Sequence, residues 1–411
     1  MDWLRELGVR ERRAFVAAFG GWALDALDYM VFSFVIPTLI SLWGITRGEA
    51  GLLATVTLLV SALGGWAAGL LADRIGRVHV LQITILWFAV FTFASGFTNN
   101  FGSLIATRAL QGFGFGGEWA VGSVLMGEIV SARNRGKAVG TVQSGWAVGW
   151  GAAAILYSAA FSLLPEEMAW RALFWIGIAP ALLVFYIRRF VPEPEVFQET
   201  RRGASRKEGA GVLAIFAPEV IRTTLLAALL TTGAQGGYYA ITTWLPTFLR
   251  TVRNLTVLNT SGYLAFIITG SFAGYLAGAY LADRIGRRMN FVLFAIGSAL
   301  VVLVYTTVEI ADDLMLVLGF PLGFFASGIF SGMGAFLTEL FPSRMRGSGQ
   351  GFTYNFGRGV GALFPTVVGY MSSTLPLGTA IGLFAGSAYA LVVIAVAGLP
   401  ETKGKELLAY D

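Results

Sequence analysis

The sequence of 411 residues contains no cysteine, a single histidine (His79) and only 13% charged residues. The lack of cysteine excludes a disulfide framework, a cysteine-ligated zinc site and a thiol nucleophile. One histidine excludes a multi-histidine metal cluster. Soluble domains carry about 25% charged residues, roughly twice the share found here. An ordinary water-soluble protein is therefore excluded, and no cofactor is expected.

Apolar, aromatic and glycine residues take the place of the missing charge. Hydrophobic residues make up 56% of the chain and aromatic residues 14%, and there are 53 glycines. Glycine allows helices to approach one another closely in lipid. This composition is typical of packed transmembrane helices.

Twelve stretches are long and apolar enough to cross a bilayer, because about 20 helical residues span about 30 Å of hydrocarbon. The predicted spans are 14–41, 50–72, 78–98, 101–128, 137–161, 169–190, 221–248, 257–282, 289–308, 313–340, 349–373 and 377–399. The first is too long for a cleavable signal and runs on into further spans. We predict an all-α integral membrane protein.

The basic residues indicate its orientation. With a cytoplasmic N-terminus, 23 of the 29 Lys and Arg residues lie in cytoplasmic segments, whereas the outer loops hold four (Arg47, Arg171, Arg250 and Arg253). Cytoplasmic loops carry such an excess. We therefore expect both termini in the cytoplasm and the chain in the plasma (cytoplasmic) membrane. The net charge of +5 then faces anionic lipid rather than nucleic acid.

A polar stretch divides the spans into two groups of six. Residues 191–214 combine charges, prolines and small residues, as linkers do. We predict a six-helix bundle over 1–190, a cytoplasmic linker over 191–214, a second bundle over 215–399 and a tail over 400–411.

The two groups share repeated motifs. GLLADRIGR at 69–77 matches AYLADRIGR at 279–287, and GEIVSARNRG at 127–136 matches TELFPSRMRG at 338–347. The nearly equal offsets indicate parallel repeats. Charged groups near helix ends can bind one another or a neighbouring helix end in one conformation and separate in another. These motifs therefore predict a conformational latch. The alternative is that each motif is a generic charged turn. The candidate latch residues are Gly69, Asp73, Arg74, Gly76, Arg77, Glu128, Arg135, Asp283, Arg284, Gly286, Arg287, Glu339 and Arg346.

The chain resembles the major facilitator superfamily over essentially its whole length. The resemblance rests on the twelve spans, the duplicated DRxGR turn and the charged loops after spans 4 and 10. It implies two pseudo-symmetric six-helix bundles around a central cavity, and transport by alternating access.

Three further segments resemble the sialate:proton symporter family, which includes lactate and pyruvate permeases. They are GWALDALDYM (21–30), RALQGFGFGGEWAVG (108–122) and YNFGRGVGALFP (354–365), and aromatic-acid symporters share parts of them. The resemblance implies proton-coupled uptake of a carboxylate. Fungal lactate permeases carry a His and an Asp in helix 7, whereas TTGAQGGYYAITTWLPTF at 231–248 has neither.

Five charged residues fall inside predicted spans: Asp25, Asp28, Arg108, Glu118 and Arg358. A charge near a helix centre costs roughly 2.5–3.5 kcal/mol, so such residues usually face a cavity and act there; the alternative is a salt bridge that only holds helices together. Asp25 and Asp28 share one helix face, and two neighbouring carboxylates in a weakly solvated cavity should not both ionise easily. Asp25, Asp28 and Glu118 are therefore the candidates for carrying the coupled proton.

The two intramembrane arginines are candidates for binding a substrate carboxylate through their fork of donors. Arg358 follows Tyr354 and Asn355 by one helical turn and is the predicted anchor. Arg108 and Gln111 match the RxxQG pattern of the superfamily, which implies proton coupling as well as binding. We expect a midplane site to place both arginines near one anion. Further candidates for its wall are Gln143, Trp146, Gln235, Tyr238 and Tyr239.

The sequence thus predicts a monomeric proton-coupled importer of a small organic anion, either a monocarboxylate such as lactate or pyruvate, or sialic acid. The alternatives are an aromatic-acid:proton symporter and a proton-independent facilitator of a neutral solute. An enzyme is not expected, because the chain has no HExxH, GxSxG or Walker A motif.

Overall fold

The computed structural model describes residues 5, 7–129, 138, 140–192, 215–341 and 346–403, and these are helical apart from short connections. Most of the predicted linker therefore lies outside the described residues. The helices are α2 (Val9–Trp43), α3 (Arg47–Ile75), α4 (Arg77–Ser95), α5 (Phe101–Ile129), α7 (Gly145–Leu163), α8 (Glu166–Ile176), α9 (Pro180–Phe190), α11 (Ile221–Thr251), α12 (Val257–Ile285), α13 (Arg287–Thr307), α14 (Asp312–Gly328), α15 (Met333–Leu340), α16 (Arg346–Gly361), α17 (Leu363–Met371) and α18 (Leu377–Gly398).

Each predicted span coincides with one helix or with two consecutive helices, so the prediction of twelve helical spans is confirmed. Four spans are broken in the described part of the chain: between α8 and α9, between α14 and α15, between α16 and α17, and at Ser144, where the helical residues 140–143 end just before α7. Pro180 opens α9, and Pro365 lies just after the break at Ala362. Proline has no N–H to donate to the residue four positions earlier. These breaks were not predicted.

In the described part of the chain, nine helical stretches are long and apolar enough to cross a membrane. The three spans that fall short are α5, α11 and α16–α17. They carry polar residues along their length, among them Arg108, Gln235 and Arg358. All three of these side chains are buried. These three polar groups therefore face protein rather than lipid.

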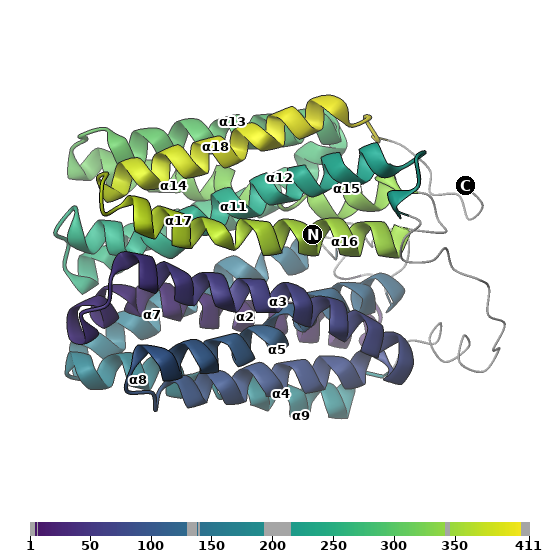
Figure 1. Ribbon diagram of the computed structural model, residues 1–411. Helices are drawn as coiled ribbons and strands as arrows, with labels where there is room; N and C mark the ends of the chain where they lie inside the picture. Colours follow the sequence, from purple (N-terminus) through teal and green to yellow (C-terminus); the bar gives the residue numbers. More distant parts are fainter. Residues whose placement is uncertain are drawn as a thin grey trace.

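The helices form two groups (Figure 1), α2–α9 below and α11–α18 above in this view. We call them the N-half and the C-half. Contacts between the halves join α2 to α11, α3 to α16 and α17, and α7 to α12. We use "outer end" for the end of the helices predicted to face away from the cytoplasm.

The repeated LADRIGR motif forms the same turn in both halves. Gly76 joins α3 to α4 with φ of 109°, and Gly286 joins α12 to α13 with φ of 96°. A residue with a Cβ is strained at such φ values, which explains a glycine at both positions. The side chains of Asp73, Arg74, Glu128, Asp283 and Arg346, and all of Arg135, lie outside the described part; Gly69 lies within α3.

An ion pair joins the two motifs of the C-half. Arg287 donates from Nη2 to Oε1 of Glu339 at 3.0 Å and from Nε to Oε2 at 3.2 Å. Thr402 donates to the same Oε2 at 2.6 Å. In the N-half, Arg77 donates to the carbonyl of Ala72 at 2.8 Å. The fork of Arg287 is thus tied to the end of α15, where an inner latch would act.

Glu401, which the sequence analysis did not single out, covers the start of α13. Its carboxylate accepts the backbone N–H groups of Arg287 at 2.9 Å and Arg288 at 3.0 Å, as expected for an anion at a helix N-terminus. Partial burial favours a higher pKa, but these N–H groups and those of Thr402 and Lys403 offset it and hold the pKa of Glu401 below its usual value. Lys403 also donates to the carbonyl of Arg284 at 2.8 Å.

Candidate functional site

The five charges predicted inside spans are all buried. Asp25, Asp28, Arg108, Glu118 and Arg358 are each at most 2% exposed, and among the described residues no other Asp, Glu, Lys or Arg is buried. Burying an ionised group without a partner costs several kcal/mol (roughly 3–5 when one partner of a buried pair is removed). The partners of these five groups therefore decide what each can do.

Asp28 and Arg108 form a network inside the N-half. Asp28 accepts from Thr92 of α4 at 2.6 Å, from Gln111 at 2.6 Å and from Arg108 at 3.3 Å. The Arg108 guanidinium also lies over the ring of Phe32 at 4.7 Å, a cation–π contact. The charge of Arg108 is therefore balanced within its own half.

Asp25, Glu118 and Arg358 form a second centre, contributed by α2, α5 and α16. The carboxyl groups of Asp25 and Glu118 face each other, close enough to hydrogen-bond if one is protonated, and both interact electrostatically with Arg358. No described residue donates a hydrogen bond to either carboxyl, or accepts one from Nε or Nη1 of Arg358. Such unpartnered buried groups are uncommon and call for an explanation.

Aromatic rings surround this second centre. Trp146 lies 4.9 Å from Trp22, 5.9 Å from Tyr29 and 6.4 Å from Tyr238, measured between ring centroids. The Arg358 guanidinium lies 5.3 Å from the ring of Tyr354 and 5.7 Å from that of Phe115. We call these rings the aromatic cluster: Trp22, Tyr29, Phe115, Trp146, Tyr238, Tyr239, Phe330 and Tyr354.

Gln235 of α11 lies beside Arg358, whereas the side chain of Asn355 of α16 bonds within its own helix. Gln235 donates to the carbonyl of Tyr354 at 2.9 Å and accepts from the hydroxyl of Tyr239 at 3.2 Å, so it holds the wall beside Arg358. Asn355 donates to the carbonyl of Gly351 in its own helix at 3.0 Å. Its side chain is turned toward Gly65 of α3.

The predicted residues thus divide into two centres rather than one. Arg108 and Arg358 lie against different acids: Asp28 for Arg108, and the Asp25–Glu118 pair for Arg358. That both arginines lie near one substrate anion stays a prediction. Asp25 and Asp28 remain neighbours but face different partners. Gln143 is buried one turn before Trp146, and no contact in the described part joins it to Arg358.

Sequence reasoning missed Trp22, Tyr29, Phe115, Phe330 and Thr92. A signal existed for Trp22 and Tyr29, which lie three residues before and four after Asp25 and so share its helix face. Phe115 likewise lies three residues before Glu118. Thr92 and Phe330 carried no such signal, because they belong to other helices and meet the site only through tertiary packing.

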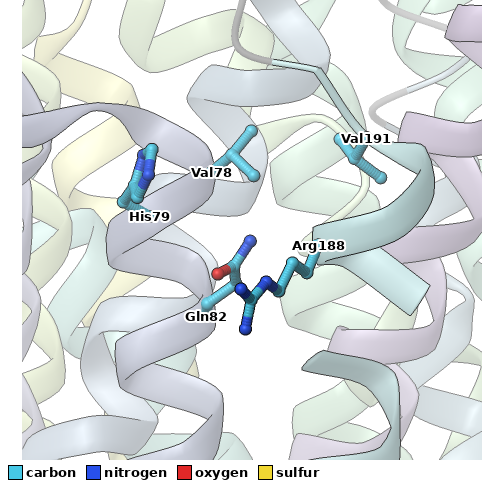
Figure 2. A pocket seen from close by; sticks show the side chains of 5 residues that line it. All are labelled: Val78, His79, Gln82, Arg188 and Val191. Carbon is cyan, nitrogen blue, oxygen red and sulfur yellow. The ribbon is translucent and has the colours of Figure 1, made fainter. Parts of the chain in front are cut away.

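A pocket of about 390 Å³ lies apart from both centres. It is lined by Val78, His79, Gln82, Arg188 and Val191, and Figure 2 shows the side chains of Gln82 and Arg188 reaching toward each other. All its residues belong to the N-half, at the predicted cytoplasmic ends of α4 and α9. It contains none of the predicted site residues.

The position of Glu118 depends on a glycine in α2. A Cβ at Gly21 would collide with the Glu118 carboxyl, so we expect Gly21→Ala to displace Glu118 from Asp25. Because alanine favours a helix by roughly 0.5–1 kcal/mol, the free energy of unfolding should not fall. Initial uptake rates in proteoliposomes should fall about ten-fold or more, since small displacements at a functional centre have large effects.

Gly20→Ala is the matched control for this prediction. A Cβ at Gly20 meets only Leu183, at an ordinary 3.8 Å, and its uptake should equal that of the unmodified protein. Equal activity of the Gly20 and Gly21 variants would show that the position of Glu118 does not matter for uptake.

The chain is similar in sequence to a known family and to several transporters. The family described as Major Facilitator Superfamily matches residues 18–365 and 265–408. A probable 4-methylmuconolactone transporter of Cupriavidus pinatubonensis is 43% identical over 98% of this chain and 93% of its own length. A cis,cis-muconate transport protein of Acinetobacter baylyi is 31% identical, covering 90% and 89% of the two chains.

Two further similarities bear on the fold and on the expected substrate. The sialic acid transporter NanX of Escherichia coli is 28% identical over 96% of this chain and 95% of its own. The solved structure of the proton:xylose symporter XylE superposes with a TM-score of 0.78, at 18% identity, over 97% of this chain and 98% of that one. At that identity the likeness shows the fold alone.

Proposed function

The chain belongs to the major facilitator superfamily and is a secondary transporter of small organic metabolites rather than an enzyme, and on that basis we propose that it imports a ring-derived or unsaturated carboxylate together with a proton. One observation carries the proposal: the buried Arg358 fork has unpartnered nitrogens and lies among aromatic rings. Arginine suits a carboxylate, and aromatic walls suit a flat apolar body.

The aromatic-acid alternative is thereby preferred to lactate or sialic acid. Two relatives are named for muconolactone and muconate transport. A muconolactone carries one carboxylate and a lactone, muconate carries two carboxylates, and both have an unsaturated carbon frame. Lactate offers little surface to rings, and sialic acid carries many hydroxyls that a largely aromatic wall would leave unpaired. We therefore do not carry the lactate assignment forward.

The Asp25–Glu118 pair is proposed to carry the coupled proton. Two carboxyl groups in contact hold one proton between them, which leaves one negative charge to balance Arg358. When a substrate carboxylate binds Arg358, the pair takes up a second proton, so that the net charge of the site stays at zero. One proton then crosses with each monocarboxylate, and the cycle is electroneutral. Asp28 and Arg108 would stay paired within the N-half during this cycle.

Opening the outer side would break polar contacts between the halves. Tyr29 and Thr243 hydrogen-bond at 2.8 Å, and Arg250 of α11 donates to Tyr157 of α7 at 3.1 Å. Closing the outer side remakes them. We propose that these bonds form the outer gate and that the Arg287–Glu339 pair belongs to the inner latch.

Counterflow in proteoliposomes tests the proposal. Vesicles loaded with unlabelled 4-hydroxybenzoate should take up the radiolabelled compound transiently, whereas lactate-loaded and sialate-loaded vesicles should not exchange their own labelled compounds. Protein-free vesicles control for passage of the protonated acid through lipid. Exchange of lactate or sialate, with none of 4-hydroxybenzoate, would overturn the assignment.

A further inference from the structure

The site offers a single positive charge to a ligand. The buried cations in the described residues are Arg108 and Arg358, and Asp28 already pairs with Arg108. A ligand with two carboxylates could place only one of them on Arg358. Its second carboxylate would be buried without a cation, which is strongly unfavourable.

A group of uncharged hydroxyls adjoins the aromatic cluster on the side of the C-half. We call it the hydroxyl cluster: Tyr238 of α11, Tyr275 and Ser271 of α12, and Ser327 of α14. Ser327 donates to Ser271 at 2.8 Å, and Ser271 donates to the carbonyl of Gly323 at 3.4 Å. Tyr275 lies near Tyr238 and Ser327. All four residues are at most 3% exposed.

The Tyr238 hydroxyl is the member that faces the rings. It approaches Ser327 and the indole of Trp146 but completes no hydrogen bond with a described residue. Its ring lies 6.2 Å from that of Tyr239, and the Tyr239 hydroxyl in turn reaches toward Arg358. Tyr239 thus contacts both Tyr238 and Arg358, and so connects the cation to the hydroxyl cluster.

We infer that the substrate is a monocarboxylate with a second, uncharged oxygen at its far end, such as a ring hydroxyl or a lactone carbonyl, and that Tyr238 binds this oxygen while Arg358 binds the carboxylate. A hydroxyl can both donate and accept, so Tyr238 suits either oxygen. It gives no charge to balance a second carboxylate. The inference rests on the proposed function and narrows its substrate class.

Titration calorimetry on the purified, full-length protein with three ligands of one shape tests the inference. The ligands are benzoate, 4-hydroxybenzoate and terephthalate, which carry hydrogen, hydroxyl and carboxylate opposite the first carboxylate. We expect 4-hydroxybenzoate to bind about ten-fold more tightly than benzoate, as one neutral hydrogen bond allows, and terephthalate at least about 100-fold more weakly than 4-hydroxybenzoate.

The variant Tyr238→Phe separates a specific role from a structural one. The ratio of the two Kd values, benzoate over 4-hydroxybenzoate, should fall from about ten toward one. Tyr305→Phe is the control, because Tyr305 is another buried tyrosine with an unpartnered hydroxyl outside the aromatic cluster; its ratio should stay at about ten.

The outcomes are distinguishable. If none of the three ligands binds, the proposed substrate class itself fails, and the inference with it. If the benzoates bind but terephthalate binds as tightly as 4-hydroxybenzoate, only the inference is overturned. The same holds if the Tyr238 variant keeps the ratio of the unmodified protein.

Discussion

Replacing Arg358 with glutamine should lower the kcat/KM of carboxylate uptake at least about 100-fold. The fork of Arg358 is the site's available cation, and a charge-assisted bidentate contact is worth about 3 kcal/mol or more, which corresponds to that factor. Arg358→Lys keeps the charge but not the fork of donors, so its kcat/KM should lie between those of the unmodified protein and Arg358→Gln. Radiolabelled uptake into proteoliposomes measures the effect.

Two controls separate lost binding from lost folding. Arg222 is exposed at the start of α11, and Arg222→Gln should transport normally. Because removing Arg358 leaves Asp25 and Glu118 without their cation, the thermal midpoint of each variant must be measured as well. A folded Arg358→Gln protein with normal carboxylate uptake would show that Arg358 does not bind the substrate carboxylate.

A disulfide between the outer ends of α3 and α17 should stop transport almost completely. Thr366 of α17 donates to Thr55 of α3 with 2.7 Å between the hydroxyl oxygens, and Thr55 also donates to the carbonyl of Ala362. The double variant Thr55→Cys, Thr366→Cys brings two thiols close enough for an S–S bond of about 2.0 Å. Alternating access requires these outer ends to separate, so the oxidised protein should lose more than about 90% of its uptake.

The chain is well suited to this experiment because it contains no native cysteine. Each single cysteine variant should stay active under oxidation, and a reductant should restore the double variant. Full activity of the cross-linked protein, with the disulfide verified by mass, would show that α3 and α17 need not separate during transport.

The sequence was sufficient for the elements that depend on local physics. Span length and hydropathy located all twelve spans, although the breaks in four of them were missed. The duplicated glycines Gly76 and Gly286 were recognised as turn residues, and both have positive φ. The cost of a charge in lipid correctly selected the five buried ionisable groups.

The sequence did not predict which helices pack against one another. Helical periodicity tells which face a residue occupies, but it does not tell which helix packs against that face. Asp25 and Asp28 were therefore grouped together, whereas a rotation between them sends one to Glu118 and the other to Arg108. The hydroxyl of Tyr238 and the residue Ser327 are separated by almost ninety positions in the sequence, and only the packing of α11 against α14 brings them to one wall.

The most direct test of the account is a count of protons per substrate molecule. Proteoliposomes with a pH-sensitive dye inside can report proton entry while labelled 4-hydroxybenzoate uptake is measured in parallel, at zero membrane potential. We predict one proton for each carboxylate in the unmodified protein, and loss of the substrate-dependent proton signal in Glu118→Gln. Uptake with no accompanying proton, or a Glu118→Gln protein that still brings in one proton per substrate, would contradict the assignment of the Asp25–Glu118 pair as proton carrier.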